Sequence, residues 1–187
     1  MAAVGDGFVY LAIPKCGGTW CKAALNAAGV DWWEDQGEHG IPRKKEADPR
    51  LWFTVIRDPA SWLRSYYHFR CVHKIDIYWH LDVSADRSQT FSRFVEDVYT
   101  RNGGGVVGRI FAEYTDHADV VYDLTQQPEM LARILARCNE SFDYSGLHNC
   151  EPINRGKGLA SIKVSDMATI RENEPGVYRR WEDRMGW

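Results

Sequence analysis

The sequence contains no long hydrophobic run and no basic, apolar leader at its amino terminus. None of its apolar stretches approaches the roughly 20 residues that a membrane-spanning helix needs. The first seven residues, Met-Ala-Ala-Val-Gly-Asp-Gly, lack the charged start and apolar centre of a signal peptide. We therefore expect a cytoplasmic protein that does not associate with membranes.

The sequence also lacks the cysteine pattern of a metal site or a disulfide scaffold. Its five cysteines are an odd number, and their spacing is not that of metal ligands. Reduced thiols and no bound metal are the expectation. An excess of positive charge is absent too, because the net charge is −3. This balance argues against a general nucleic-acid binder, so any anion site must arise from local placement of Arg and Lys.

What remains is the composition of an ordinary globular protein. The 187 residues are 44% hydrophobic, 13% aromatic and 26% charged, with no repeat or low-complexity segment. A chain of this length can bury a sizeable core. We expect a single domain spanning residues 1–187.

Residues 8–20 carry the most informative pattern, Phe8-Val-Tyr-Leu-Ala-Ile-Pro-Lys-Cys-Gly-Gly-Thr-Trp20. A strand-forming run breaks at a proline, a Lys/Gly/Gly/Thr loop follows, and a helix-forming stretch begins. Backbone N–H groups at a helix start bind anions with the help of the helix dipole. Gly17 and Gly18 allow close backbone approach, Lys15 adds positive charge, and Thr19 adds a hydroxyl donor. The pattern predicts a phosphate cradle, but its lysine precedes the glycines, unlike the Walker order.

Residues 52–69 repeat the strand–turn–helix arrangement, Trp52-Phe-Thr-Val-Ile-Arg-Asp-Pro-Ala-Ser-Trp-Leu-Arg-Ser-Tyr-Tyr-His-Phe69. Arg57 falls at the carboxyl end of the strand, where open α/β sheets bind ligands. Ser65 follows eight residues later, in the helix. Arg57 can form a forked pair with a phosphate, to which Ser65 adds a hydroxyl. The alternative for Arg57 is a strand-end salt bridge with Asp58 or another carboxylate.

The two motifs together resemble those of sulfotransferases that use 3′-phosphoadenosine 5′-phosphosulfate (PAPS). The first is similar to that family's Pro-Lys-x-Gly-Thr-Thr-Trp loop, and the second to its Arg-Asn/Asp-Pro-x5-Ser motif. The resemblance implies a three-layer α/β/α fold with a central parallel sheet, of the P-loop nucleotide-kinase-like type. It also implies PAPS as co-substrate without a metal, and a small-molecule, glycan or peptide acceptor with a hydroxyl or amine. The residues of the first motif that it assigns to cofactor binding are Lys15, Cys16, Gly17, Gly18, Thr19 and Trp20; Arg57 and Ser65 fall to the 3′-phosphate.

Within the first motif the roles differ. Lys15 is the candidate to stabilise the bridging oxygen as it leaves. Thr19 is expected to bind the 5′-phosphate, with helix capping as its alternative, and Trp20 to lie against adenine, with core packing as its alternative. Cys16 is read as a small loop residue, although a redox or nucleophilic role is open. Gly18 departs from the family pattern, because a hydroxyl residue usually stands there.

The acceptor needs a general base, and His39 is the leading candidate. It lies in Glu38-His-Gly-Ile-Pro42, in the interval where sulfotransferases often carry a catalytic His or Glu. Glu38 and Glu34 are alternatives, and a solvated histidine is the third possibility. His68, in the Tyr-Tyr-His-Phe run, is expected to be structural.

A late basic segment, Asn154-Arg-Gly-Lys-Gly158, is similar in chemistry to the Arg-Lys-Gly with which cytosolic sulfotransferases cover the 3′-phosphate. Arg155 and Lys157 are therefore candidate cofactor-binding residues, and a solvated loop is the alternative. Two other functions stay open for the whole chain. One is a P-loop-like nucleotide kinase, and the other is a non-catalytic module that binds PAPS or adenosine 3′,5′-bisphosphate (PAP). The acceptor and the oligomeric state are not fixed by the sequence.

Local signals predict the remaining elements. Strands are expected at 8–13, 52–56 and 119–122, with residues 31–50 and 139–164 irregular. Gly29 is expected to end the first helix, Thr90 to cap one helix and Ser165 another. The expected helices are 19–28, 60–69, 90–100, 106–115, 128–138 and a final stretch from 165.

Overall fold

The computed structural model of the 187-residue chain describes residues 2–35, 47–72, 81–83, 88–151 and 160–178. Residue contacts divide the chain into two compact units. The first comprises Met1–Ile56 and Glu113–Arg155, and the second comprises Arg57–Ala112 and Gly156–Trp187. No helix in the described part of the chain is long and apolar enough to cross a bilayer.

The first unit is built on a five-stranded sheet with the order β3-β1-β2-β4-β5. Strands β2 (Phe8–Leu11), β4 (Leu51–Ile56) and β5 (Val120–Asp123) are parallel neighbours, as the sequence predicts. Two antiparallel strands, β1 (Ala2–Val4) and β3 (Trp33–Asp35), extend the sheet beyond β2. The fold is therefore α/β, but the sheet is mixed rather than wholly parallel.

The parallel strands form because their sequences suit burial on both faces. β2 is buried at all four positions, and β4 at every position after Leu51. Strands covered on both faces read as continuous apolar runs rather than alternating ones. β3 is the opposite case, since all three of its residues are exposed.

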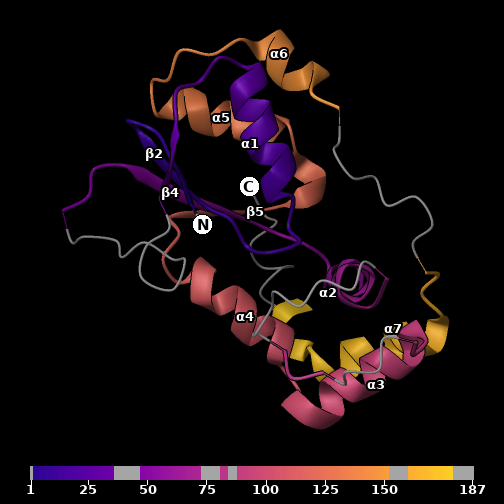
Figure 1. Ribbon diagram of the computed structural model, residues 1–187. Helices are drawn as coiled ribbons and strands as arrows, with labels where there is room; N and C mark the ends of the chain where they lie inside the picture. Colours follow the sequence, from indigo (N-terminus) through magenta and orange to yellow (C-terminus); the bar gives the residue numbers. More distant parts are fainter. Residues whose placement is uncertain (1, 36–46, 73–80, 84–87, 152–159, 179–187) are drawn as a thin grey trace. The chain divides into compact units, whose positions relative to one another are not determined.

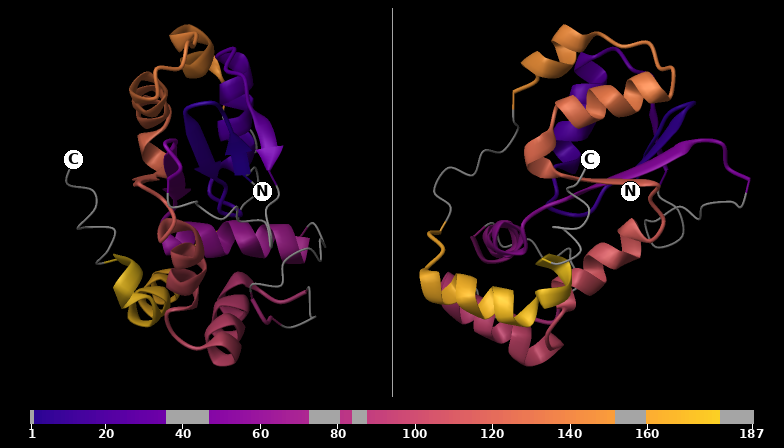
Figure 2. Two further views of the ribbon diagram at one scale, coloured as in Figure 1. Left: turned by 90° about the vertical axis from the view of Figure 1, so that its left-hand side faces the viewer. Right: turned by 180° about the vertical axis from the view of Figure 1, so that it is seen from behind.

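Three helices cover one face of this sheet: α1 (Gly18–Ala27), α5 (Glu129–Arg137) and the short α6 (Tyr144–Asn149) (Figure 1 and Figure 2). α1 ends where Gly29 adopts a left-handed φ of 69°, as predicted. α6 packs tightly on α1, because a Cβ on Gly146 would lie 2.1 Å from the carbonyl oxygen of Ala27. The sequence does not predict α6, which falls in an interval that we expected to be irregular.

The second unit is helical. α2 (Pro59–Tyr67) continues into a π-helical turn, η2 (His68–Val72), and packs with α3 (Phe91–Asn102) and α7 (Val164–Asn173). Most of α4 (Val106–Thr115) belongs to this unit, where Phe111 meets the Trp62 ring edge-on at 5.8 Å. Thr90 caps α3 by accepting the Arg93 N–H, as predicted. The predicted cap at Ser165 is wrong, since α7 begins at Val164 and Lys163 occupies the capping position.

Candidate functional site

The carboxyl ends of β2 and β4 lie next to each other at one edge of the sheet. The two strands are parallel and hydrogen-bonded, and their register places Leu11 opposite Thr54. Lys15 follows four residues after Leu11, and Arg57 follows directly after the last residue of β4. Both predicted motifs therefore start from strand ends at the edge where open α/β sheets bind ligands.

The loop after β2 turns sharply through two left-handed residues. Lys15 has a φ of 66° and Gly17 a φ of 84°. The Cys16 N–H bonds the carbonyl of Ile13 at 3.1 Å, which closes the turn. A left-handed conformation costs a non-glycine residue about 1–2 kcal/mol. Such strain is often found at functional sites, where the surrounding structure holds it in place.

The loop leads into a helix start that lacks a side-chain cap. Gly17 is the N-cap of α1, and the first helical bond runs from the Cys21 N–H to the Gly17 carbonyl at 2.9 Å. No side chain in the described part of the chain caps this end, and the first turn contains no acidic residue. Thr19 is exposed and does not occupy the capping position, so helix capping does not explain it. Uncapped N–H groups at the positive end of a ten-residue helix, preceded by Lys15, suit an anion.

The two glycines of the loop have different surroundings. A Cβ on Gly17 would lie 2.5 Å from Leu124 Cδ1 and 3.6 Å from Gln127 Oε1. A Cβ on Gly18 would meet Ala12 Cβ at 3.4 Å and the Tyr10 hydroxyl at 3.8 Å, which are ordinary contacts. Gly17 is thus required by the packing, whereas Gly18 is not. Among the described residues, nothing around Gly18 sterically excludes the hydroxyl residue that the sulfotransferase motif has at this position.

Two predicted cradle residues face the core instead. Trp20 is 8% exposed, packs in the buried cluster of the first unit, and donates its Nε1–H to the Cys150 carbonyl at 3.1 Å. This placement supports the core-packing alternative for Trp20 over contact with adenine. Cys16 is fully buried, which fits a small loop residue rather than a reactive thiol.

At the start of α2, Asp58 acts as a helix cap. One of its oxygens accepts the Ser61 N–H at 2.8 Å, and the other accepts the Tyr178 hydroxyl at 3.2 Å. Burial, reinforced by the charge of Asp58, raises the pKa of Tyr178 well above its ordinary value. The two predicted 3′-phosphate residues on either side of this cap, Arg57 and Ser65, are half-buried.

Of the three candidate bases, the structure describes only Glu34. His39 and Glu38 lie outside the described residues, as do the candidate cofactor-binding residues Arg155 and Lys157. Glu34 is exposed on β3 and accepts a hydrogen bond from the Lys22 ammonium, which lowers the pKa of the Glu34 carboxyl. A carboxylate that is already paired is a weaker base.

The described surroundings of His68 bear out its expected structural role. The Nε2 atom of His68 accepts the backbone N–H of Ala160 at 2.8 Å within the second unit. Through this hydrogen bond the His68 side chain holds the backbone at Ala160.

Neither thiols nor carboxylates form a metal centre in the described part of the chain. All five cysteines are free, and no group of three or more His, Cys, Asp or Glu side chains among the described residues could hold an ion. Asp123, at the end of β5, is 3% exposed and accepts hydrogen bonds from the backbone and hydroxyl of Thr125. A surface depression of about 350 Å³, lined in part by Asp6 and Arg50, lies near the start of β4, away from the cradle.

One residue near the cradle escaped the sequence analysis. Tyr10 on β2 is fully buried, and its hydroxyl has no hydrogen-bond partner among the described residues. In sequence Tyr10 is simply one aromatic residue of an apolar strand. Its significance depends on a tertiary contact, which no local pattern reveals.

Comparison with known proteins adds no relative: no family model matches the chain, and no curated protein or solved structure matches it either.

Proposed function

We propose that the protein is a PAPS-dependent sulfotransferase that transfers a sulfuryl group to a hydroxyl or amine acceptor and releases PAP. The observation that carries the proposal is the loop after β2, in which the left-handed Lys15 is followed by a helix start that no described side chain caps. Arg57, which belongs to the second motif, follows directly after the last residue of the neighbouring parallel strand, β4. A compact α/β/α sulfotransferase fold of the P-loop nucleotide-kinase type is part of this proposal.

The chemistry that we assign to the cradle is electrostatic. Sulfuryl transfer is an in-line displacement at sulfur, during which negative charge builds on the departing phosphate oxygen. The backbone N–H groups of Gly18 and Thr19, at the start of α1, would hold the 5′-phosphate, and Lys15 would place its ammonium group on the bridging oxygen. Because the donors belong to a packed strand and helix, little reorganisation is needed during the reaction.

The second motif would select the nucleotide. A guanidinium such as that of Arg57 pairs with a phosphate through two parallel hydrogen bonds. Ser65 would add a hydroxyl to the same 3′-phosphate. Asp58, which lies between these two residues in the chain, caps the start of α2 by accepting the Ser61 N–H. His39 is the proposed base, and Arg155 and Lys157 are proposed to cover the bound nucleotide.

The proposal is tested by sulfuryl transfer from ³⁵S-labelled PAPS to a panel of hydroxyl and amine acceptors, alongside calorimetric titration of PAP. We expect transfer by the wild-type chain, and loss of transfer in Lys15→Ala and Arg57→Ala. Full transfer by both variants would refute the assignment.

The same assays separate the two alternative functions. Tight PAP binding without transfer to any acceptor indicates a non-catalytic binding module. Magnesium-dependent ATP turnover indicates a nucleotide kinase. Against the kinase stands the order of the loop, since Lys15 precedes Gly17 and Gly18 and no Gly-Lys-Ser/Thr follows that could bind magnesium.

A further inference from the structure

Tyr10 presents a buried donor that the fold of the first unit does not satisfy. Its ring stacks on Phe53 with centroids 5.0 Å apart, and its side chain is fully buried. The hydroxyl nevertheless has no hydrogen-bond partner among the described residues. A buried hydroxyl that makes no hydrogen bond destabilises the folded state, so each such group calls for an explanation.

The hydroxyl lies beneath the start of α1. The position that a Cβ on Gly18 would occupy is 3.8 Å from the Tyr10 oxygen. Gly18 is the first residue of the uncapped helix end. Two kinds of donor that have no side-chain acceptor among the described residues, the N–H groups at the start of α1 and the Tyr10 hydroxyl, therefore both lie near Gly18.

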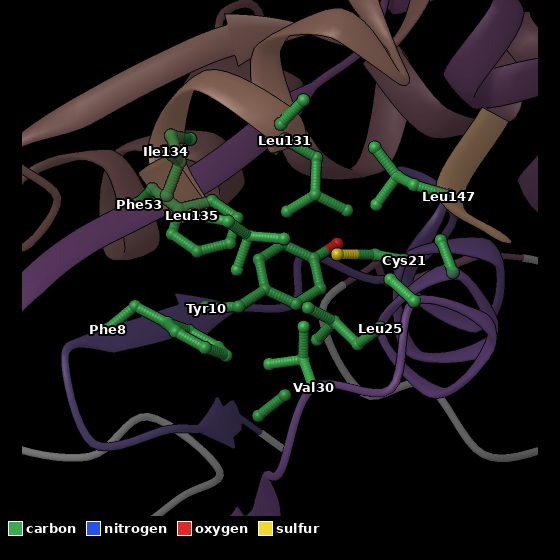
Figure 3. Close-up of a cluster of buried hydrophobic side chains, with 14 of the residues drawn as sticks. Phe8, Tyr10, Cys21, Leu25, Val30, Phe53, Leu131, Ile134, Leu135 and Leu147 are labelled. Carbon is green, nitrogen blue, oxygen red and sulfur yellow. The ribbon is translucent and has the colours of Figure 1, made fainter. Parts of the chain in front are cut away.

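The neighbours of the hydroxyl are poor acceptors. Figure 3 shows the Tyr10 oxygen beside the sulfur of Cys21, and a thiol accepts hydrogen bonds only weakly. Burial raises the pKa of the Cys21 thiol, which keeps it neutral. The nearby Tyr122 hydroxyl already accepts the Gln127 Nε2–H at 3.3 Å. Burial also raises the pKa of Tyr10, so its hydroxyl keeps the proton that it would donate.

We propose that the Tyr10 hydroxyl is a positioning donor for a tetrahedral oxyanion, a phosphate or sulfate group of the nucleotide, bound at the start of α1. It supplies the donor that a hydroxyl side chain at position 18 would supply and that Gly18 lacks. The proposal rests on the proposed function for its ligand, PAP or PAPS. The geometry requires only an oxyanion, so the proposal can be tested apart from that function.

The test compares wild type with Tyr10→Phe in two measurements: the dissociation constant for PAP, and the denaturation midpoint of the unliganded protein. A hydrogen bond to a charged acceptor is worth about ten- to a hundred-fold in affinity. We expect Tyr10→Phe to bind PAP at least tenfold more weakly, with an unchanged or higher midpoint. A purely structural tyrosine would leave the affinity unchanged, and this result would overturn the proposal while leaving the sulfotransferase assignment intact.

Two further variants sharpen the test. Tyr67→Phe is the matched control, because it removes a hydroxyl that already donates to the Gln89 carbonyl at 2.8 Å. It is expected to lower the midpoint without changing the PAP affinity. Adding Gly18→Ser to Tyr10→Phe restores a hydroxyl at the same place, so the double variant should recover most of the lost affinity. Failure of this rescue counts against the proposal.

Inorganic pyrophosphate separates this inference from the proposed function. If wild type binds pyrophosphate but not PAP, the sulfotransferase assignment fails, and a weaker pyrophosphate affinity in Tyr10→Phe still supports the oxyanion site. If wild type binds neither ligand, both proposals are overturned. Should Tyr10→Phe fail to fold, wild type labelled with ¹³Cζ-tyrosine provides the measurement. A Tyr10 resonance that does not move on saturation with the ligand that binds overturns the role of the hydroxyl.

Discussion

A methyl group on Gly17 would overlap Leu124, since its carbon would lie 2.5 Å from Leu124 Cδ1. Gly17 also has a φ of 84°, which L-residues adopt only with strain. Two features therefore require a glycine at this N-cap of α1. One is its left-handed backbone conformation, and the other is the contact with Leu124, on the segment after β5.

This relationship predicts that Gly17→Ala destabilises the protein by more than about 2 kcal/mol, because the left-handed backbone alone accounts for about 1–2 kcal/mol. Denaturant unfolding measures the change. Gly29→Ala is the matched control, since Gly29 has a similar φ of 69° but no atom of the described residues lies within 4 Å of its Cβ position. The Gly29 variant should lose only the backbone contribution. Equal losses in the two variants would show that Leu124 moves aside without cost.

We predict that Lys15 increases the rate of sulfuryl transfer but lowers the unfolding free energy, because its backbone is left-handed. Both Lys15→Ala and Lys15→Gly remove the ammonium group, and each should lower the rate of sulfuryl transfer by about 10²–10³-fold, the size reported for a lost oxyanion donor. Lys15→Gly should also be more stable than Lys15→Ala by about 1 kcal/mol, because glycine adopts a φ of 66° without strain. Transfer assays and denaturant unfolding test the two halves separately. Arg133→Ala, which removes an exposed cation of the same unit, should change neither.

Arg57 is predicted to determine selectivity for the 3′-phosphate. Wild type should bind PAP more tightly than adenosine 5′-phosphate, and Arg57→Ala should bind the two with nearly equal affinity. Loss of a charge-assisted bidentate pair corresponds to about 1.5–3 kcal/mol in the PAP affinity. Calorimetry with both nucleotides provides the measurement, and Arg93→Ala, on the exposed face of α3, is the control. An Arg57 variant that keeps the preference for PAP would place the 3′-phosphate elsewhere.

Glu174 is predicted to make stability depend on pH. It is fully buried and accepts the N–H groups of Val107 at 2.9 Å and Gly108 at 3.0 Å, at the start of α4. Burial is the largest effect, and it raises the pKa of Glu174 above its ordinary value of 4.5. The folded state then binds more protons than the unfolded state once the pH exceeds that ordinary value. The unfolding free energy should therefore fall as the pH rises towards the folded-state pKa.

Glu174→Gln removes the titration but keeps only one of the two acceptor oxygens, so the pH dependence of its unfolding free energy, rather than its absolute stability, isolates this effect. Its unfolding free energy should lack the fall that wild type shows above pH 4.5. Glu174→Ala should be destabilised by about 1–3 kcal/mol for each buried N–H group that loses its partner. Parallel pH slopes in wild type and Glu174→Gln would mean that another group produces the dependence.

Local sequence signals were sufficient for the elements that depend on local chemistry. The three parallel strands follow from continuous apolar runs, and α3 follows from the Thr90 cap. The end of α1 follows from Gly29, whose conformation few other residues adopt easily. The turn after β2 belongs to the same group, since its glycines allow the chain to turn there, but the left-handed backbone of Lys15 was not predicted.

The elements that escaped prediction depend on contacts between distant residues. β1 is only three residues long and exists because it pairs with β2 and β3. α6 has six residues, too few for the spacing of apolar residues to predict a helix. It packs against α1 at Gly146. The orphan hydroxyl of Tyr10 likewise depends on which residues surround it. The sequence analysis identified residues that belong to a recognisable motif. It missed Tyr10, whose interest depends only on where the fold places its hydroxyl.

Among the described strands, β3 forms the outer edge of the sheet, and its charges have a consequence for self-association. Glu34 and Asp35 put two carboxylates on an exposed strand of three residues. An open strand edge invites a second chain to add to it, and charged side chains discourage that addition. Two carboxylates at this edge therefore disfavour the addition of a strand from a second copy of the chain, which would bring like charges together.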